Sequence, residues 1–144
     1  MPHNIAVIGT GYVGLVTGAC FADCGHDVTI TDVDPAKVRT IKGKRAPVFE
    51  AGLKNLLTRT IGRNLWASLS YDSVSTSDLT FVCVGTPPNE DGSANLTHIE
   101  SASRSIGTAL QNATRYHVVV VKSTVPPGTT DTVVRPAVLV SANK

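Results

Sequence analysis

The stretch from Asn4 to Asp34 constrains the fold most, because a glycine-rich turn stands there between an apolar strand and a helix. An apolar run rich in β-branched residues predicts a buried strand at 5–8, and the sequence GTGYVG follows at once. No strong helix breaker occurs from Tyr12 to Cys24, and the glycine after it is expected to end that helix. A second strand at 28–31 then runs into Asp32. Strand, glycine turn, helix, strand and acid within about 30 residues are the context in which GxGxxG predicts a dinucleotide site.

Each glycine of the turn has a physical role in this interpretation. Gly9 permits the tight turn off the strand, and Gly11 lets the backbone approach a pyrophosphate. Gly14 lets the helix pack closely against the strand. The free N–H groups around Tyr12 and Val13 would face the phosphates at the positive end of the helix dipole. The alternative is a glycine-rich turn that binds no ligand.

The acid at the end of the second predicted strand indicates which coenzyme would bind. Asp32 lies 18 residues after Gly14, near the spacing at which a carboxylate accepts hydrogen bonds from the adenosine ribose. A carboxylate there repels a 2′-phosphate, which favours NAD over NADP. Asp34 precedes Pro35 and is better suited to cap the next helix. Lys37 would lie one turn into that helix, near the adenosine, although its position in the sequence alone favours a solvated surface lysine.

Composition is typical of one globular domain. The chain has 144 residues, of which 42% are hydrophobic and 17% charged. A net charge of +2 is too small to indicate nucleic acid or an anionic membrane as a partner. No apolar run approaches the roughly 20 residues that span a bilayer. The N-terminus lacks the basic region of a signal peptide, so a cytoplasmic protein is expected.

Three cysteines occur, Cys20 and Cys24 in the first predicted helix and Cys83 in an apolar strand. An odd count and the lack of clustered ligands argue against disulfides and against a metal site. We expect three small buried thiols.

Strands alternate with helices along the rest of the chain, which predicts right-handed crossovers and a parallel sheet. Further strands are expected at 65–70, 79–84 and 117–121, and further helices at 35–41, 53–61, 73–77, 97–113 and 130–139. Pro136 should kink or interrupt the last helix. The predicted fold is α/β, a Rossmann-type doubly wound parallel sheet with strand order 3-2-1-4-5. A sixth strand would lie beyond Lys144.

Two loops follow apolar strands and should therefore lie at the carboxyl edge of the sheet, where ligands bind in open α/β folds. The first begins with Gly85 and Thr86, followed by two prolines. The second, at 122–130, also contains two prolines, which hold it extended.

Three segments together resemble the nucleotide-sugar 6-dehydrogenases, a family that includes UDP-glucose and GDP-mannose dehydrogenases. The matching segments are IAVIGTGYVGLVTGACFADCGHDVTITDVDPAKV at 5–38, FVCVGTPPNEDGSANL at 81–96 and VVVVKSTVPPGTT at 118–130. VFEAGL at 48–53 resembles the family's EPGL segment, with Ala51 where proline is usual. The likeness covers nearly the whole chain and is far more specific than the glycine pattern alone.

The resemblance implies an activity and a set of coenzyme contacts. The family oxidises the sugar C6 alcohol to a carboxylate in two NAD-dependent hydride transfers, through an active-site cysteine. It implies that the Val13 amide meets the pyrophosphate and that Thr86 and Thr124 lie toward the nicotinamide. Thr124 would help to hold a catalytic water, or its hydroxyl would satisfy the loop backbone. The expected coenzyme-binding residues are Gly9, Gly11, Tyr12, Val13, Gly14, Asp32, Lys37, Gly85, Thr86 and Thr124.

The family's catalytic cysteine and its partners belong to domains that would follow Lys144, and Cys83 does not match that nucleophile. We therefore expect residues 1–144 to be the NAD-binding domain of a longer enzyme, inactive alone, with no catalytic residue and no metal of its own. The parent enzyme would convert UDP-glucose to UDP-glucuronate with two NAD and pair as a homodimer. Alternatives are a GDP-mannose or UDP-N-acetylmannosamine dehydrogenase, a stand-alone nucleotide-binding module, and a hydroxyacyl or phosphogluconate dehydrogenase.

Overall fold

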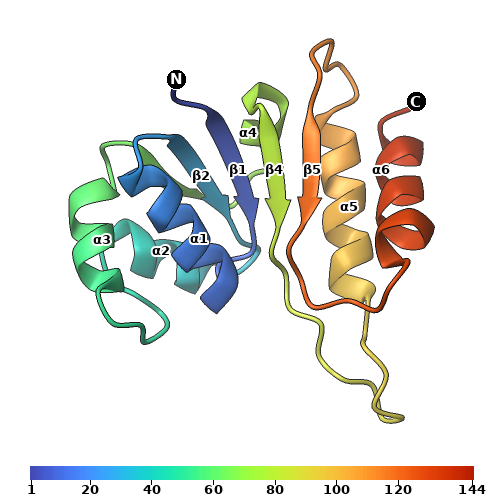
Figure 1. The fold of residues 1–144 in the computed structure, drawn as a ribbon, viewed down its shortest axis with the longest axis horizontal. Helices are drawn as coiled ribbons and strands as arrows, with labels where there is room; N and C mark the ends of the chain where they lie inside the picture. Colours follow the sequence, from blue (N-terminus) through green and yellow to red (C-terminus); the bar gives the residue numbers. More distant parts are fainter.

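Five parallel strands form one sheet in the order β3-β2-β1-β4-β5, as predicted (Figure 1). The computed structural model describes residues 1–144. The strands are β1 (Asn4–Ile8), β2 (Asp27–Thr31), β3 (Leu65–Ser68), β4 (Leu79–Val82) and β5 (Val118–Val121). The helices are α1 (Tyr12–Asp23), α2 (Pro35–Lys42), α3 (Leu53–Thr60), α4 (Asp72–Thr76), α5 (Thr97–Ala109) and α6 (Arg135–Ser141), with a π-helical turn η1 (Thr130–Val134) before α6.

Each face of the sheet has its own hydrophobic core, because side chains alternate along each strand. On one face, Val7 and Ile30 pack with residues of α1, α2 and α3, including the buried Leu15. On the other face, Ile8 and Val82 pack with residues of α4, α5 and η1. Helices on both faces make this a doubly wound α/β fold. No helix combines the length and apolar character that crossing a membrane requires.

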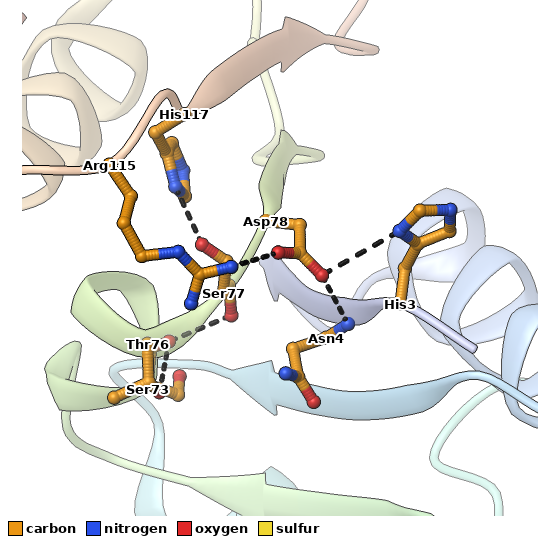
Figure 2. A network of polar contacts seen from close by, with 8 residues as sticks. All are labelled: His3, Asn4, Ser73, Thr76, Ser77, Asp78, Arg115 and His117. Atoms are coloured by element: carbon orange, nitrogen blue, oxygen red, sulfur yellow. Dashed lines mark hydrogen bonds and ion pairs between the residues drawn. The ribbon is translucent and has the colours of Figure 1, made fainter. Parts of the chain in front are cut away.

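The amino-terminal edge of the sheet is held together by a polar network (Figure 2). The Asp78 carboxylate accepts hydrogen bonds from the backbone N–H of Asn4 at 2.9 Å and from Arg115 at 2.8 Å. His3 lies 3.6 Å from the same carboxylate. The Asn4 hydrogen bond, with the charge of Arg115, holds the pKa of Asp78 below its ordinary value. The network joins the starts of β1, β4 and β5.

His117 in the same network is half-buried between two partners. Its Nδ1 lies 2.9 Å from the carbonyl oxygen of Ser77, and its Nε2 lies 2.9 Å from the Thr80 hydroxyl. A carbonyl only accepts, so Nδ1 carries the hydrogen and the neutral ring accepts at Nε2 from Thr80.

Three predicted element boundaries need correction. The strands expected at 65–70 and 79–84 each end two residues earlier, and the helix expected at 97–113 ends at Ala109 because the chain turns at Leu110. Pro136 was expected to kink or interrupt the last helix, and the α-helical winding is interrupted directly before it. The turn before it is wound as η1, which places Pro136 in the first turn of α6, where its missing N–H costs no hydrogen bond.

The expectation of three buried thiols is wrong for two of them. Cys83 is buried, but Cys20 and Cys24 are exposed. The side of α1 that faces the sheet is formed by small and apolar residues, among them Gly18 and Ala19, which leaves Cys20 on the solvent side. Because α1 is apolar almost all round, its sequence carries no signal for the outward face.

Candidate functional site

All the predicted site residues lie at or just beyond the carboxyl edge of the sheet, the lower edge in Figure 1. The glycine turn follows β1, and Asp32 follows β2. Gly85 and Thr86 follow β4, and Thr124 follows β5. The topology therefore brings four separate segments of the sequence to one edge, around the point where the strand order reverses between β1 and β4.

The glycine turn is fixed by contacts that exclude a side chain at two positions. Gly9 has φ +103°, and a Cβ atom there would lie 2.7 Å from the carbonyl oxygen of Cys83. A Cβ on Gly14 would overlap the carbonyl oxygen of Gly9. The Gly9 N–H donates to the carbonyl of Thr31 at 2.8 Å, which ties the turn to β2. These two glycines serve the packing of β1, α1 and β4.

Gly11 differs, because no atom lies within 4 Å of where its Cβ would stand. Gly11 is the N-cap of α1 and no side chain caps the helix. The first hydrogen bond of the helix runs from the Leu15 N–H to the Gly11 carbonyl at 3.0 Å. The N–H groups of Tyr12 and Val13 therefore lack intrahelical partners and stand at the positive end of the dipole. This open helix start suits a diphosphate.

Asp32 is partly buried, and its carboxylate is held by the chain itself. Thr10 donates to Oδ2 twice, from its backbone N–H at 2.8 Å and from its hydroxyl at 2.6 Å. The Asp34 N–H donates to Oδ1 at 2.9 Å. Lys37 Nζ lies 3.9 Å from Oδ2, on a side chain that is 45% exposed. Lys37 is thus beside the carboxylate and still reaches solvent.

The carboxylate of Asp32 is ionised at neutral pH. Burial works against the charge, but the hydrogen bonds from Thr10 and Asp34, with the nearby charge of Lys37, hold the pKa of Asp32 below its ordinary value. Asp34 itself caps α2, as predicted, by accepting from the Ala36 N–H at 2.8 Å.

The two loops after β4 and β5 are joined by hydroxyl groups. The Thr86 hydroxyl donates to the main-chain carbonyl of Thr124 at 2.7 Å. The Ser123 hydroxyl donates to the carbonyl of Val84 at 2.7 Å. Gly85 is exposed, with open space where a Cβ would stand. Thr86 and Ser123 thus hold the loop, and the Thr124 hydroxyl has no hydrogen-bond partner in the chain.

Sequence reasoning missed two residues that shape this edge, Thr10 and Ser123. Thr10 is only 1% exposed and stands between two glycines, a position that the glycine pattern leaves unspecified. The feature that could have indicated its role is a short hydroxyl side chain inside the turn, because such a hydroxyl readily donates a hydrogen bond to a nearby carboxylate. Ser123 had no signal beyond its place in the loop.

Cys83 lies beneath the glycine turn and is unsuited to attack a substrate. Burial raises the pKa of the Cys83 thiol to about 11, against the opposing charge of Lys122. The nucleophilic thiolate is therefore almost absent at neutral pH. The site offers amides for a diphosphate, a carboxylate for a ribose and hydroxyls at the far end. His98, in the first turn of α5, lies beside this edge with its Nδ1 3.2 Å from the Gly85 carbonyl oxygen.

Comparison with known proteins gives a consistent result. A model of the NAD-binding domain of the UDP-glucose/GDP-mannose dehydrogenase family matches residues 3–144. The UDP-glucose 6-dehydrogenase of Rhizobium meliloti is 46% identical over 135 residues, which are 92% of this chain and 30% of that enzyme.

Two solved structures match with high scores. A UDP-glucose dehydrogenase from the hyperthermophilic archaeon Pyrobaculum islandicum has a TM-score of 0.94 and 42% identity, over 99% of this chain and 33% of that one. A ternary complex of GDP-mannose dehydrogenase from Pseudomonas aeruginosa has a TM-score of 0.95 and 37% identity, over 98% of this chain and 33% of that one. The chain therefore spans about a third of the length of the relatives that it matches.

Proposed function

The chain belongs to the UDP-glucose/GDP-mannose dehydrogenase family, as its NAD-binding domain, and on this premise we propose that it supplies the coenzyme site of an NAD-dependent nucleotide-sugar 6-dehydrogenase. The observation that carries the proposal is the open start of α1 at Gly11, next to the ionised Asp32. An anion site and a ribose acceptor at the switch point of a doubly wound sheet are what a dinucleotide requires.

The proposed coenzyme runs along the carboxyl edge from Asp32 to Thr124. The Val13 and Tyr12 amides meet the diphosphate, with Gly11 leaving room for its approach. Asp32 accepts from the adenosine ribose, and Lys37 flanks that sugar. NAD is favoured over NADP because a 2′-phosphate would bring its charge against the carboxylate of Asp32.

The nicotinamide end lies, in this proposal, over the loops that follow β4 and β5. Gly85 permits close approach of the ring, and Thr86 holds the loop of Thr124 in place through its 2.7 Å hydrogen bond. The free Thr124 hydroxyl is then available to a water or to the coenzyme. NAD supplies the hydride chemistry, and this chain binds and orients it.

We propose further that these residues work within a longer enzyme, because the relatives that match are about three times as long. The catalytic cysteine, the sugar-nucleotide site and the homodimer contacts would lie in its other domains. The exposed free thiols of Cys20 and Cys24 support a reducing, cytoplasmic location. The parent substrate we propose is UDP-glucose, oxidised at C6 to UDP-glucuronate with two NAD.

A GDP-mannose dehydrogenase is the second candidate, since the Pseudomonas aeruginosa structure of that activity superposes with a TM-score of 0.95. UDP-N-acetylmannosamine is a third candidate substrate. A stand-alone nucleotide-binding module is the remaining alternative, whereas membership of this family sets aside the hydroxyacyl and phosphogluconate dehydrogenases. Assay of the full gene product with each sugar nucleotide, by NADH absorbance, decides the substrate. A reading frame that stops after the codon for Lys144 would support the stand-alone module.

Isothermal titration of residues 1–144 tests the coenzyme site directly. NAD should bind, NADP should bind at least about tenfold more weakly, and UDP-glucose should give no heat. Asp32→Asn should weaken NAD binding by about 1–2 kcal/mol, because it removes a charge-assisted hydrogen bond to ribose. It should also reduce the preference over NADP. Well-folded protein that binds no nucleotide, or prefers NADP, would contradict the proposal.

A further inference from the structure

The Asp32 carboxylate has four positions at which it can accept hydrogen bonds, two on each oxygen. Oδ2 receives two hydrogen bonds from Thr10, at 2.8 Å and 2.6 Å. Oδ1 receives one from the Asp34 N–H, at 2.9 Å. Only one accepting position, on Oδ1, stays open for a ligand. The carboxylate cannot therefore hold both ribose hydroxyls with full hydrogen bonds while Thr10 is in place.

We infer that Thr10 is a positioning residue that locks the Asp32 carboxylate so that Oδ1 alone meets one hydroxyl of the adenosine ribose. The inference rests on the proposed coenzyme site and adds to it a residue that neither the glycine pattern nor the expected site residues include. This role does not require Thr10 to contact the coenzyme. It acts through Asp32.

Two features make Thr10 suited to this role. Its side chain is 1% exposed, so no water competes for its hydroxyl, and the hydroxyl has the carboxylate as its acceptor at a short 2.6 Å. Its backbone N–H also donates to the carboxylate, and Thr10 directly precedes Gly11, where the diphosphate would approach. The acceptor for the ribose and the loop for the diphosphate are thus held in one geometry by one residue. Charged hydrogen bonds of this kind are stronger than neutral ones.

The surroundings of Asp32 contain few other ionisable groups. The Lys37 ammonium on α2 faces Oδ2 at 3.9 Å, and the Asp34 carboxylate is turned to the Ala36 N–H. The Tyr71 phenol, ahead of α4, is near enough that burial and the charge of Asp32 raise its pKa above the ordinary value. Tyr71 therefore stays neutral at physiological pH.

The pH dependence of NAD binding separates positioning from simple packing. Binding needs ionised Asp32 and is lost as the pH falls through its pKa. Thr10→Val keeps the shape but removes the O–H donor, so the pKa of Asp32 rises and the acid limb of binding moves to higher pH. A residue that only packs would change the unfolding free energy and leave this limb in place. Protonation of NAD itself affects every variant equally, so it does not contribute to the difference in pH dependence between variants.

The experiment is calorimetric titration of NAD from pH 8 down to about pH 2.5, over the range in which each protein stays folded, with wild type, Thr10→Val, Thr10→Ser and Thr60→Val. Thr60 is the matched control, a buried threonine in α3 whose hydroxyl donates to the Leu56 carbonyl at 2.7 Å. We expect Thr10→Val to bind about tenfold more weakly at pH 7. Its acid limb should lie at higher pH, whereas Thr10→Ser and Thr60→Val should follow the wild type.

If Thr10→Val bound NAD with the wild-type affinity and the same pH dependence, the inference would be overturned. The proposed function would still stand, because the wild type binds NAD. A loss that is the same at every pH and is not restored by Thr10→Ser would also overturn it, because packing alone gives that pattern. Failure of folded wild type to bind NAD would overturn the proposed function and the inference with it. If Thr10→Val does not fold, the titration of Asp32 in the wild type by carboxyl ¹³C NMR decides. An Asp32 pKa at the ordinary aspartate value would contradict the inference that Thr10 holds the ionised carboxylate.

Discussion

Gly14 lies directly against the carbonyl oxygen of Gly9, so closely that a Cβ atom on Gly14 would overlap it. The same atom would lie 3.1 Å from the Cβ of Cys83. Gly14→Ala should therefore push α1 off β1 and destabilise the chain by about 3 kcal/mol or more. The gain of about 1 kcal/mol in helix propensity is too small to offset this. Urea unfolding followed by circular dichroism measures the difference, and unchanged stability would contradict such close packing of α1 on the turn.

Gly11→Ala provides the complementary test, since the new methyl group would stand in open space. The backbone at Gly11, with φ −67°, is open to any residue. Stability should change by at most about 1 kcal/mol, mainly because alanine is a poorer N-cap. NAD binding should fall at least about tenfold, because the methyl group occupies the approach of the diphosphate. Calorimetry and urea unfolding of the same sample separate the two effects. Normal binding by Gly11→Ala would place the diphosphate elsewhere.

His117 should make stability depend on pH at the opposite edge of the sheet. Burial lowers the pKa of His117, against the Ser77 carbonyl and the charge of Asp78, which raise it. In the unfolded chain the His117 imidazole is protonated below about pH 6.5, whereas in the folded chain it stays neutral to lower pH. The free energy of unfolding should therefore fall as the pH decreases below that value.

Urea unfolding of wild type and of His117→Gln at pH 7.5 and 5.5 measures this dependence. The variant should be less stable at pH 7.5 and should lose less stability on acidification. His98→Gln, which alters an exposed histidine, is the control and should keep the wild-type dependence. If the His117 variant kept the wild-type pH dependence, the loss of stability in acid would have to come from another group.

Thiol reactivity should follow the burial of the three cysteines. Iodoacetamide at pH 7.5 should modify the exposed Cys20 and Cys24 quickly. Cys83 should react only in urea, because burial raises the pKa of its thiol to about 11. Mass spectrometry counts the adducts, and Cys20→Ser should lower the fast count by one. A third fast adduct in the native chain would show that Cys83 is accessible.

The sequence predicted the unit β1–α1–β2 and the strand order because each signal was local or topological. The glycine turn marks a helix start, apolar runs mark buried strands, and right-handed crossovers limit the order. Asp34 was recognised as a cap from the proline that follows it. These features need no knowledge of which side chains meet.

Contacts between distant residues could not be predicted in the same way. The bond from Thr10 to Asp32 joins residues that follow different strands and depends on how the turn is wound. The outward position of Cys20 depends on which side of a uniformly apolar helix meets the sheet. The π-helical turn before Pro136 is a local adjustment that propensity alone does not describe.

The Asp78 network occupies one rim of the sheet, and the proposed coenzyme residues occupy the other. Strands of four or five residues separate the two rims by roughly 13–17 Å. Substitutions at one rim can therefore change the stability of the fold without changing ligand affinity at the other rim. Substitutions in the Asp78 network can change stability to heat or acid while the residues proposed to hold the coenzyme keep their geometry.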